Sequence, residues 1–179
     1  MTNRIRPTIL LLALTCGATA AHAGPQADVE VDPLAYALGG SSVHVGIHQG
    51  RLRADLGAFS LDVPEAFHGN ADFSLSMAGA GLKLDYFLFA RRSGLHMGAE
   101  VSVVKSTVIE VQSTQAERHI NATIGARLGY RIDISKAFYV DPWIGLGYVS
   151  GRDLQIAGRT YSHSNLSVFP TVHLGYRFD

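Results

Sequence analysis

The sequence is nearly devoid of cysteine, since its 179 residues include only Cys16. A disulfide framework and a cysteine-ligated metal site each need several thiols, so neither is expected. A surplus of basic charge is also missing, because the 15 lysines and arginines are matched by 15 aspartates and glutamates. A nucleic-acid-binding surface requires such a surplus, and no nucleic-acid partner is therefore expected.

Long apolar runs are absent after the N-terminal segment, and no later stretch reaches the roughly 18 residues of a transmembrane helix. At the N-terminus, Arg4 and Arg6 precede a short apolar stretch over residues 8–14, which is followed by Ala-His-Ala at residues 21–23. This order is typical of a secretory signal peptide, and we expect cleavage after Ala23.

Cleavage at Ala23 would leave residues 24–179 as a single domain without cysteine. Without Arg4 and Arg6, 13 of the 15 basic residues remain against 15 acidic ones, a weakly negative balance. Acylation of Cys16 as a lipoprotein is the alternative, but Leu14-Thr15 is a poor lead-in because lipoprotein signals have small residues there.

The mature part of the chain alternates apolar and polar residues with period two. The clearest stretch is residues 119–132, whose fourteen residues exceed the usual length of a soluble strand and suffice to cross a bilayer at a tilt. One face carries Ile120, Ala122, Ile124, Ala126, Leu128, Tyr130 and Ile132, and the other carries His119, Asn121, Thr123, Gly125, Arg127, Gly129 and Arg131. Alternation over such lengths is typical of transmembrane β-strands.

Six further segments alternate in the same way, at residues 43–48, 51–58, 74–88, 95–103, 138–149 and 168–178. Seven strands cannot complete a bacterial single-chain barrel, which has an even number. We therefore expect an eighth, first strand at residues 29–38, interrupted by Pro33. A short helix at residues 34–38 is the alternative.

The connections between these segments alternate in length. Residues 49–50, 91–94 and 133–137 are short, whereas residues 63–72, 106–118 and 150–165 are long and polar. Outer-membrane barrels have short periplasmic turns and longer extracellular loops. Within the last loop, residues 153–161 are expected to form a small hairpin that turns at Ala157-Gly158.

A short motif repeats at one end of the predicted strands. Leu128-Gly129-Tyr130-Arg131 recurs as Leu174-Gly175-Tyr176-Arg177, and Leu84-Asp85-Tyr86-Phe87 occupies the matching place one strand pair earlier. Tyr86, Tyr130, Tyr176 and Phe178 are therefore predicted to form an aromatic girdle at the membrane interface.

The long strands, the alternating connections and the aromatic last strand resemble the small eight-stranded outer-membrane barrels of the OmpA-transmembrane, OmpX and OmpW type. The resemblance covers residues 25–179 and is architectural. It implies an all-β, antiparallel, up-and-down transmembrane barrel in the bacterial outer membrane, which contacts lipid and lipopolysaccharide and is monomeric. In that group the barrel-assembly machinery reads the last strand, here residues 172–178, although Asp179 follows the terminal aromatic residue in this chain.

The inward face of the predicted strands carries charges of both signs. An eight-stranded barrel is just wide enough for side chains to fill, and a lone buried charge is costly. The charges therefore predict a salt-bridged polar plug, and a narrow gated pore is the alternative. The residues of this expected network are Arg51, Arg53, Asp55, Lys83, Asp85, Glu100, Arg127, Arg131, Asp141 and Arg177.

Signals for metal binding or catalysis are weak. His44 and His48 would lie about 13 Å apart on one strand, too far to share an ion, so the inward histidines are expected to be hydrogen-bonded interior residues. Residues 161–165 faintly resemble the His-x-Ser-Asn arrangement of PagL-type lipid A deacylases, but His163 and Ser164 are adjacent and point to opposite faces. No cofactor or metal is expected.

Three functions remain in view at this point. The leading one is a non-enzymatic outer-membrane barrel with a structural or surface-interaction role through its long loops. The first alternative is a small channel for ions or small solutes. The second alternative is a lipid A-modifying enzyme.

Overall fold

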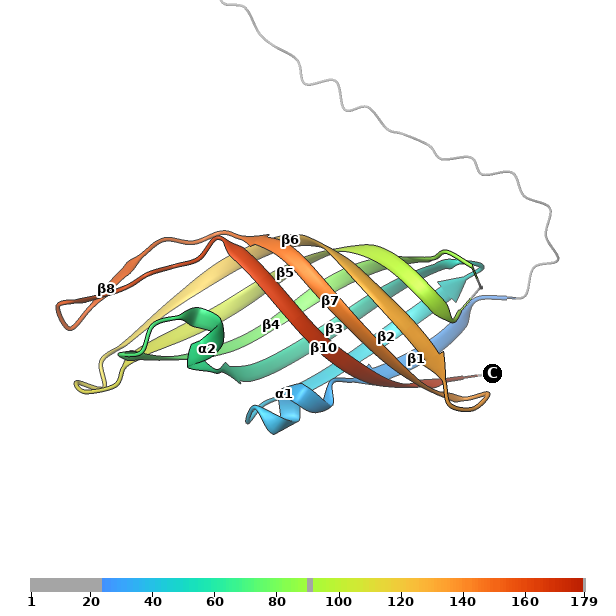
Figure 1. Ribbon diagram of the computed structural model, residues 1–179, viewed down its shortest axis with the longest axis horizontal. Helices are drawn as coiled ribbons and strands as arrows, with labels where there is room; N and C mark the ends of the chain where they lie inside the picture. The colour runs from blue at the N-terminus through green and yellow to red at the C-terminus, as the bar shows by residue number, and fades with distance from the viewer. Residues whose placement is uncertain (1–23, 90–91, 179) are drawn as a thin grey trace, which may run out of the picture.

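The computed structural model describes residues 24–89 and 92–178, and the expected signal peptide lies outside these residues. Eight antiparallel strands close into a barrel in the order β1-β10-β7-β6-β5-β4-β3-β2 (Figure 1). They are β1 (Gln26–Val31), β2 (Ser41–Gln49), β3 (Leu52–Val63), β4 (Phe73–Phe87), β5 (Gly94–Glu110), β6 (Ala116–Asp133), β7 (Phe138–Val149) and β10 (Leu166–Arg177). The predicted up-and-down all-β fold is confirmed.

The barrel is inside-out compared with a soluble protein. Among the described residues, 20 buried side chains are polar or charged and 11 are hydrophobic. The outward positions of the strands carry exposed aliphatic side chains, such as Val45 at 55%, Leu56 at 64% and Ile124 at 61%. So large an exposed apolar band would be unfavourable in water and is stable against lipid. In the described part of the chain, no helix is long and apolar enough to span a membrane.

The first strand exists but is shorter than predicted. β1 ends at Val31, and the chain then forms the helix α1 (Pro33–Ala37). Asp32 caps this helix, since its Oδ1 accepts a hydrogen bond from the backbone N–H of Leu34 at 2.8 Å. Pro33 occupies the first turn, where its missing N–H costs nothing. The predicted strand over residues 29–38 is therefore wrong beyond Val31, where the helical alternative holds.

The two ends of the barrel differ, and we call them the turn end and the loop end. The turn end carries the short connections and lies beside the C-terminus, as Figure 1 shows. The loop end carries the helix α2 (Glu65–His68) and the hairpin formed by β8 (Leu154–Ile156) and β9 (Arg159–Tyr161). Ala157 and Gly158 both have positive φ, at 52° and 76°, so the predicted hairpin and its turn are confirmed.

The predicted loop over residues 106–118 is largely wrong, because β5 and β6 remain paired as far as Ile109 and Ala116. Phe73 and Leu75 of β4 and Val108 of β5 form an apolar inner surface at the loop end, and the β8–β9 hairpin packs onto it. The resulting cluster contains Phe73, Leu75, Val108, Ile156 and Tyr161. This cluster closes the loop end of the barrel interior with ordered structure.

Candidate functional site: the barrel interior

Arg53 is the centre of an ion-pair network in the turn half of the interior. Its Nη2 lies 2.7 Å from Asp28 Oδ1, 2.8 Å from Asp55 Oδ2 and 3.1 Å from Glu30 Oε1. Its Nη1 lies 3.6 Å from Asp85 Oδ2. The residue is 0% exposed, so its charge is balanced entirely by protein groups.

Arg131 forms a second centre beside the first. Its Nη2 donates to Glu30 Oε1 at 2.7 Å and to Asp141 Oδ2 at 2.9 Å. Its guanidinium also lies over the Tyr139 ring, 4.1 Å from the ring centre, while the Tyr139 hydroxyl donates to Glu30 Oε1 at 2.8 Å. Glu30 therefore joins both centres, because it also faces Arg53.

Interior histidines hydrogen-bond to four of the buried carboxylates. His48 Nε2 lies 2.6 Å from Asp28, His96 Nε2 2.8 Å from Asp141 and His173 Nδ1 2.8 Å from Glu30. His44 Nδ1 lies 3.0 Å from Asp55. These four side chains are hydrogen-bonded interior residues, as the sequence predicted. No group of three potential metal ligands is found among residues 24–89 and 92–178.

Two important members of the network, Asp28 and Glu30, were missing from the sequence-predicted set. Both lie on β1, whose extent was misjudged. The alternation Asp28-Val29-Glu30-Val31 carries the period-two signal of a strand with an acidic inward face. This short signal was available in the sequence.

The remaining predicted members divide into paired and unpaired residues. Lys83 Nζ lies 3.3 Å from Asp55, and Arg127 Nε lies 3.3 Å from Asp85. Arg177 pairs with Asp133 near the turn end. Glu100 is half-buried and has no ion pair with any described residue.

The prediction that Arg51 belongs to the interior network is wrong, because this residue is exposed in the β2–β3 turn. Its Nη1 donates to the Leu88 carbonyl at 3.1 Å. The strand begins only at Leu52, so the alternation that placed Arg51 with Arg53 on the inward face does not extend to it.

The aromatic residues predicted as a girdle are exposed on the outer surface. The exposed fractions are 42% for Tyr86, 55% for Tyr130, 38% for Tyr176 and 49% for Phe178. The Tyr176 ring packs edge-on against Phe178 at 5.1 Å. Their role at a membrane interface remains a prediction.

The loop end lacks a catalytic arrangement at His163 and Ser164. Ser164 Oγ donates to the Leu166 carbonyl at 2.9 Å, and His163 Nε2 lies 3.4 Å from the Val149 carbonyl. Within the described chain, no hydrogen bond joins the serine to a histidine. The pair therefore offers no activated nucleophile.

The electrostatics at the loop end centre on Glu110. The Ser113 side chain and backbone hydrogen-bond to this carboxylate and lower its pKa. The Ser113 N–H lies 2.6 Å from Glu110 Oε2, and Arg159 from β9 lies 3.8 Å from Oε1. Glu110 thus connects the β5–β6 turn to the hairpin.

A cavity of about 150 Å³ separates the ion-pair network from the apolar cluster at the loop end. Lys83, His44 and His173 border it on the network side, and Met77 borders it on the cluster side. Most of its wall is apolar, contributed by Ala35, Phe59, Leu61, Met77, Val104, Trp143, Val149 and Phe169. The interior thus contains a sealed ionic half and a partly hollow half whose cavity wall is mostly apolar but also includes Glu100 and Asn121.

Comparisons with known proteins place the fold among outer-membrane barrels. No family model matches the chain, and no curated protein matches it. Neisserial surface protein A (NspA) is similar in structure, with a TM-score of 0.54 at 13% identity over 86% of this chain and 94% of that chain. A major outer membrane protein from Thermus thermophilus aligns at a TM-score of 0.49 and 10% identity over 87% and 100% of the two chains. The similarity to NspA therefore shows that the chain has the fold of a small outer-membrane β-barrel.

Proposed function

We propose that the protein is a non-enzymatic, non-conducting barrel of the bacterial outer membrane with a structural or surface-contact role. One observation carries this proposal: the turn half of the interior is filled by fully buried ion pairs. Arg53 is 0% exposed and Arg131 is 1% exposed, and each contacts several carboxylates.

A sealed interior argues against the channel alternative. A conducting path through the turn half would have to separate these buried pairs, and leaving one partner uncompensated typically costs about 3–5 kcal/mol. Aromatic side chains reinforce the plug, since Phe87 is 0% exposed and lies beside the Arg131 guanidinium, 5.1 Å from ring centre to Cζ. Thermal opening of such a plug would be rare.

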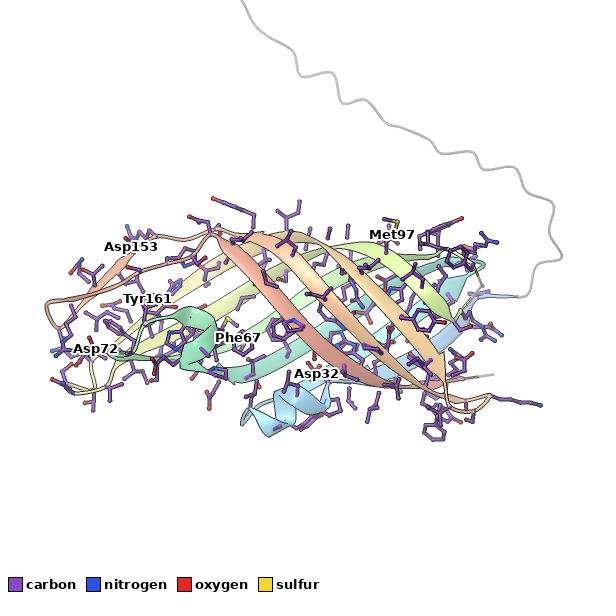
Figure 2. All side chains as sticks on the ribbon, viewed as in Figure 1. Asp32, Phe67, Asp72, Met97, Asp153 and Tyr161 are labelled. Atoms are coloured by element: carbon purple, nitrogen blue, oxygen red, sulfur yellow. The ribbon has the colours of Figure 1, made fainter. Side chains whose placement is uncertain are left out.

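The loop end supports the surface-contact part of the proposal. The long β5–β6 pair and the packed β8–β9 hairpin hold it in one arrangement, so it offers a preformed polar surface (Figure 2). Asp72 and Asp153 are exposed there, and Asp72 forms an ion pair with Arg159 at 2.6 Å. A preordered surface loses little conformational entropy when it binds a partner.

Single-channel recording in a planar bilayer tests the proposal. The refolded protein should give no discrete current steps. Because the apolar cluster also closes the loop end, a variant that combines Arg53→Ser with Ile156→Ser should give measurable conductance, which shows that the assay detects inserted barrels. Arg118→Ser at the exposed loop end should remain silent. Current steps from the unmodified protein would overturn the sealed-barrel proposal in favour of a channel.

A further inference from the structure

The barrel wall changes from strand to helix beside the apolar cavity. β1 pairs with β10 only at residues 174–177 of β10 and with β2 only at residues 44–48 of β2. Nearer the loop end, the space between β10 and β2 is occupied by α1 and its flanking residues (Figure 1). We call the boundary between α1 and β10 the seam.

The β10 side of the seam has an unpaired strand edge. The Phe178 N–H donates to the Ala27 carbonyl, so the even-numbered residues of β10 direct their backbone N toward the β1 side. Pro170, which has no N–H, is one of these residues, and it lies beyond the residues of β10 with which β1 pairs. The sequence of β10 is thus compatible with a missing neighbour at this height.

The segment that contains α1 makes more hydrogen bonds to β2 and β3 on one side than to β10 on the other. On the β2–β3 side, the Asp62 N–H donates to the Leu38 carbonyl at 2.9 Å and the Tyr36 hydroxyl to the Ser42 carbonyl at 3.1 Å. On the β10 side, Thr171 Oγ1 donates to Asp32 Oδ2 at 2.7 Å, and no other hydrogen bond crosses within the described chain. Figure 2 labels Asp32 at this junction. The seam is therefore the weakest join in this part of the wall.

The seam lies directly between the cavity and the outer surface. Ala35 on α1 is 2% exposed and lines the cavity, while Leu34 and Tyr36 on the same helix are 40% and 52% exposed. Ser167 and Phe169 from β10 line the cavity on the other side of the seam. One alanine methyl group and the adjoining backbone thus separate the cavity from the apolar surroundings of the barrel.

The size and chemistry of the cavity favour an acyl chain end as its occupant. Lys83, Glu100 and Asn121 also line the cavity, but most of its wall area is apolar. An apolar cavity of similar volume in another protein binds benzene, so the apolar wall here suits an apolar group of about six carbon atoms. Ser42, on the β2 side of α1, is 2% exposed and lines the cavity, and its Oγ has no hydrogen-bond partner among the described residues. A buried hydroxyl without a partner is unusual and suits an ester or carboxyl oxygen at the head of such a chain.

We propose that this cavity binds the apolar chain of a membrane amphiphile, admitted from the bilayer through the seam between α1 and β10. The amphiphile is identified by its chemistry, which is an acyl chain with an oxygen-bearing head. The proposal concerns the loop half of the interior and is independent of the sealed ionic half.

Trp143 provides the reporter, because it lines the cavity, is 7% exposed and is the single tryptophan of the sequence. The purified protein is reconstituted in phosphatidylcholine vesicles whose acyl chains carry bromine, which quenches tryptophan fluorescence at short range. We compare the unmodified protein with Ala35→Phe, which fills the cavity from the seam, and with Ala37→Phe, which adds the same ring on the exposed side of α1.

The unmodified protein and Ala37→Phe should be quenched, and Ala35→Phe should lose this quenching. Val104→Phe, which fills the cavity from β5, should lose it too and provides a second variant if Ala35→Phe does not fold. Equal quenching in every folded variant would mean that bromine acts through the wall, and no quenching of the unmodified protein would mean that no chain enters. Either result overturns the proposal.

A soluble probe separates bilayer lipid from an amphiphile that arrives through water. In bromine-free detergent, 6-bromohexanoate should quench Trp143 with half-saturation near millimolar concentration, since so few buried atoms give modest affinity. Ser42→Ala should raise that concentration roughly fivefold, while Ser41→Ala should not. Quenching by this probe without quenching by brominated lipid would overturn entry through the seam. A failure here leaves the conductance result unaffected, so the two proposals are tested separately.

Discussion

Arg53 and Asp28 form a bidentate ion pair across the strand that separates them. Arg53 Nε lies 3.1 Å from Asp28 Oδ2 and Nη2 lies 2.7 Å from Oδ1, although the two residues lie on β3 and β1 with β2 between them. Gly46 on β2 makes this possible, because a Cβ there would lie 2.4 Å from Asp28 Oδ1 and 2.5 Å from Arg53 Nε. The glycine and the ion pair are therefore parts of one arrangement.

Replacing Gly46 by alanine should destabilise the barrel. The added methyl must displace one member of the buried pair, and overpacking of this kind typically costs about 1–3 kcal/mol. Equilibrium urea unfolding in lipid vesicles, followed by tryptophan fluorescence, measures the change. Gly24→Ala is the control, because nothing lies within 4 Å of the added atom there. Equal stability of the two variants would contradict the assigned packing.

Removing the charge of Arg131, the second centre, should lower the free energy of unfolding by more than Gly46→Ala does. Arg131→Met leaves Glu30 and Asp141 without their guanidinium, and breaking a buried pair typically costs about 3–5 kcal/mol. The same unfolding measurement should show a far smaller effect for Arg118→Met, whose side chain is exposed. A loss below about 1 kcal/mol for Arg131→Met, as for a surface pair, would show that water reaches this network.

The hairpin at the loop end should loosen when its apolar contact is removed. Ile156 is 3% exposed in the cluster with Tyr161, and burial of such a side chain is typically worth about 2–5 kcal/mol relative to alanine. Ile156→Ala should therefore speed cleavage by a protease within residues 150–165, while the barrel itself stays intact. The Thr160→Ala variant, altered on the exposed face of the hairpin, should be cleaved at the same rate as the unmodified protein.

The loop end should also loosen in acid, because the pKa of Glu110 is lowered in the folded chain by its hydrogen bonds from Ser113. A lowered pKa means that the stabilisation is present above the ordinary value of 4.5 and is lost as the pH falls through the folded value. Amide exchange of the β5–β6 turn should accelerate over that range in the unmodified protein. In Glu110→Gln, amide exchange at neutral pH should be faster than in the unmodified protein. Its remaining pH dependence should be that of amide exchange in an unstructured chain.

The sequence predicted the strands well wherever lipid imposes a period of two. Residues 119–132 show this, because every second side chain must be apolar on the outer surface. The rule fails at the loop end, because beyond the bilayer the outer positions of β6, such as Arg118, are polar. The period-two pattern is lost there, and the sequence predicts a loop where β5 and β6 are in fact paired. β1 was misplaced because six residues give a weak alternation.

The pairing within the interior could not be predicted in the same way. Arg131 and Glu30 are 101 residues apart and lie on strands that are not neighbours, so only the closed ring brings them together. Inward alternation indicated that Arg53, Asp85 and Arg131 belong inside, but not which carboxylates they contact. The cavity could not be predicted from the sequence either, because it depends on β1 ending early and on α1 taking its place in the wall.

Heat-modifiable gel mobility of the purified protein tests the account most directly, because it detects a closed, detergent-bound barrel whose ion pairs lie inside and whose apolar side chains face outward. The unboiled sample, kept in detergent, should migrate faster than the boiled one and should show a β-rich circular dichroism spectrum. Identical mobility with and without boiling, from a protein that stays in solution without detergent, would contradict the account.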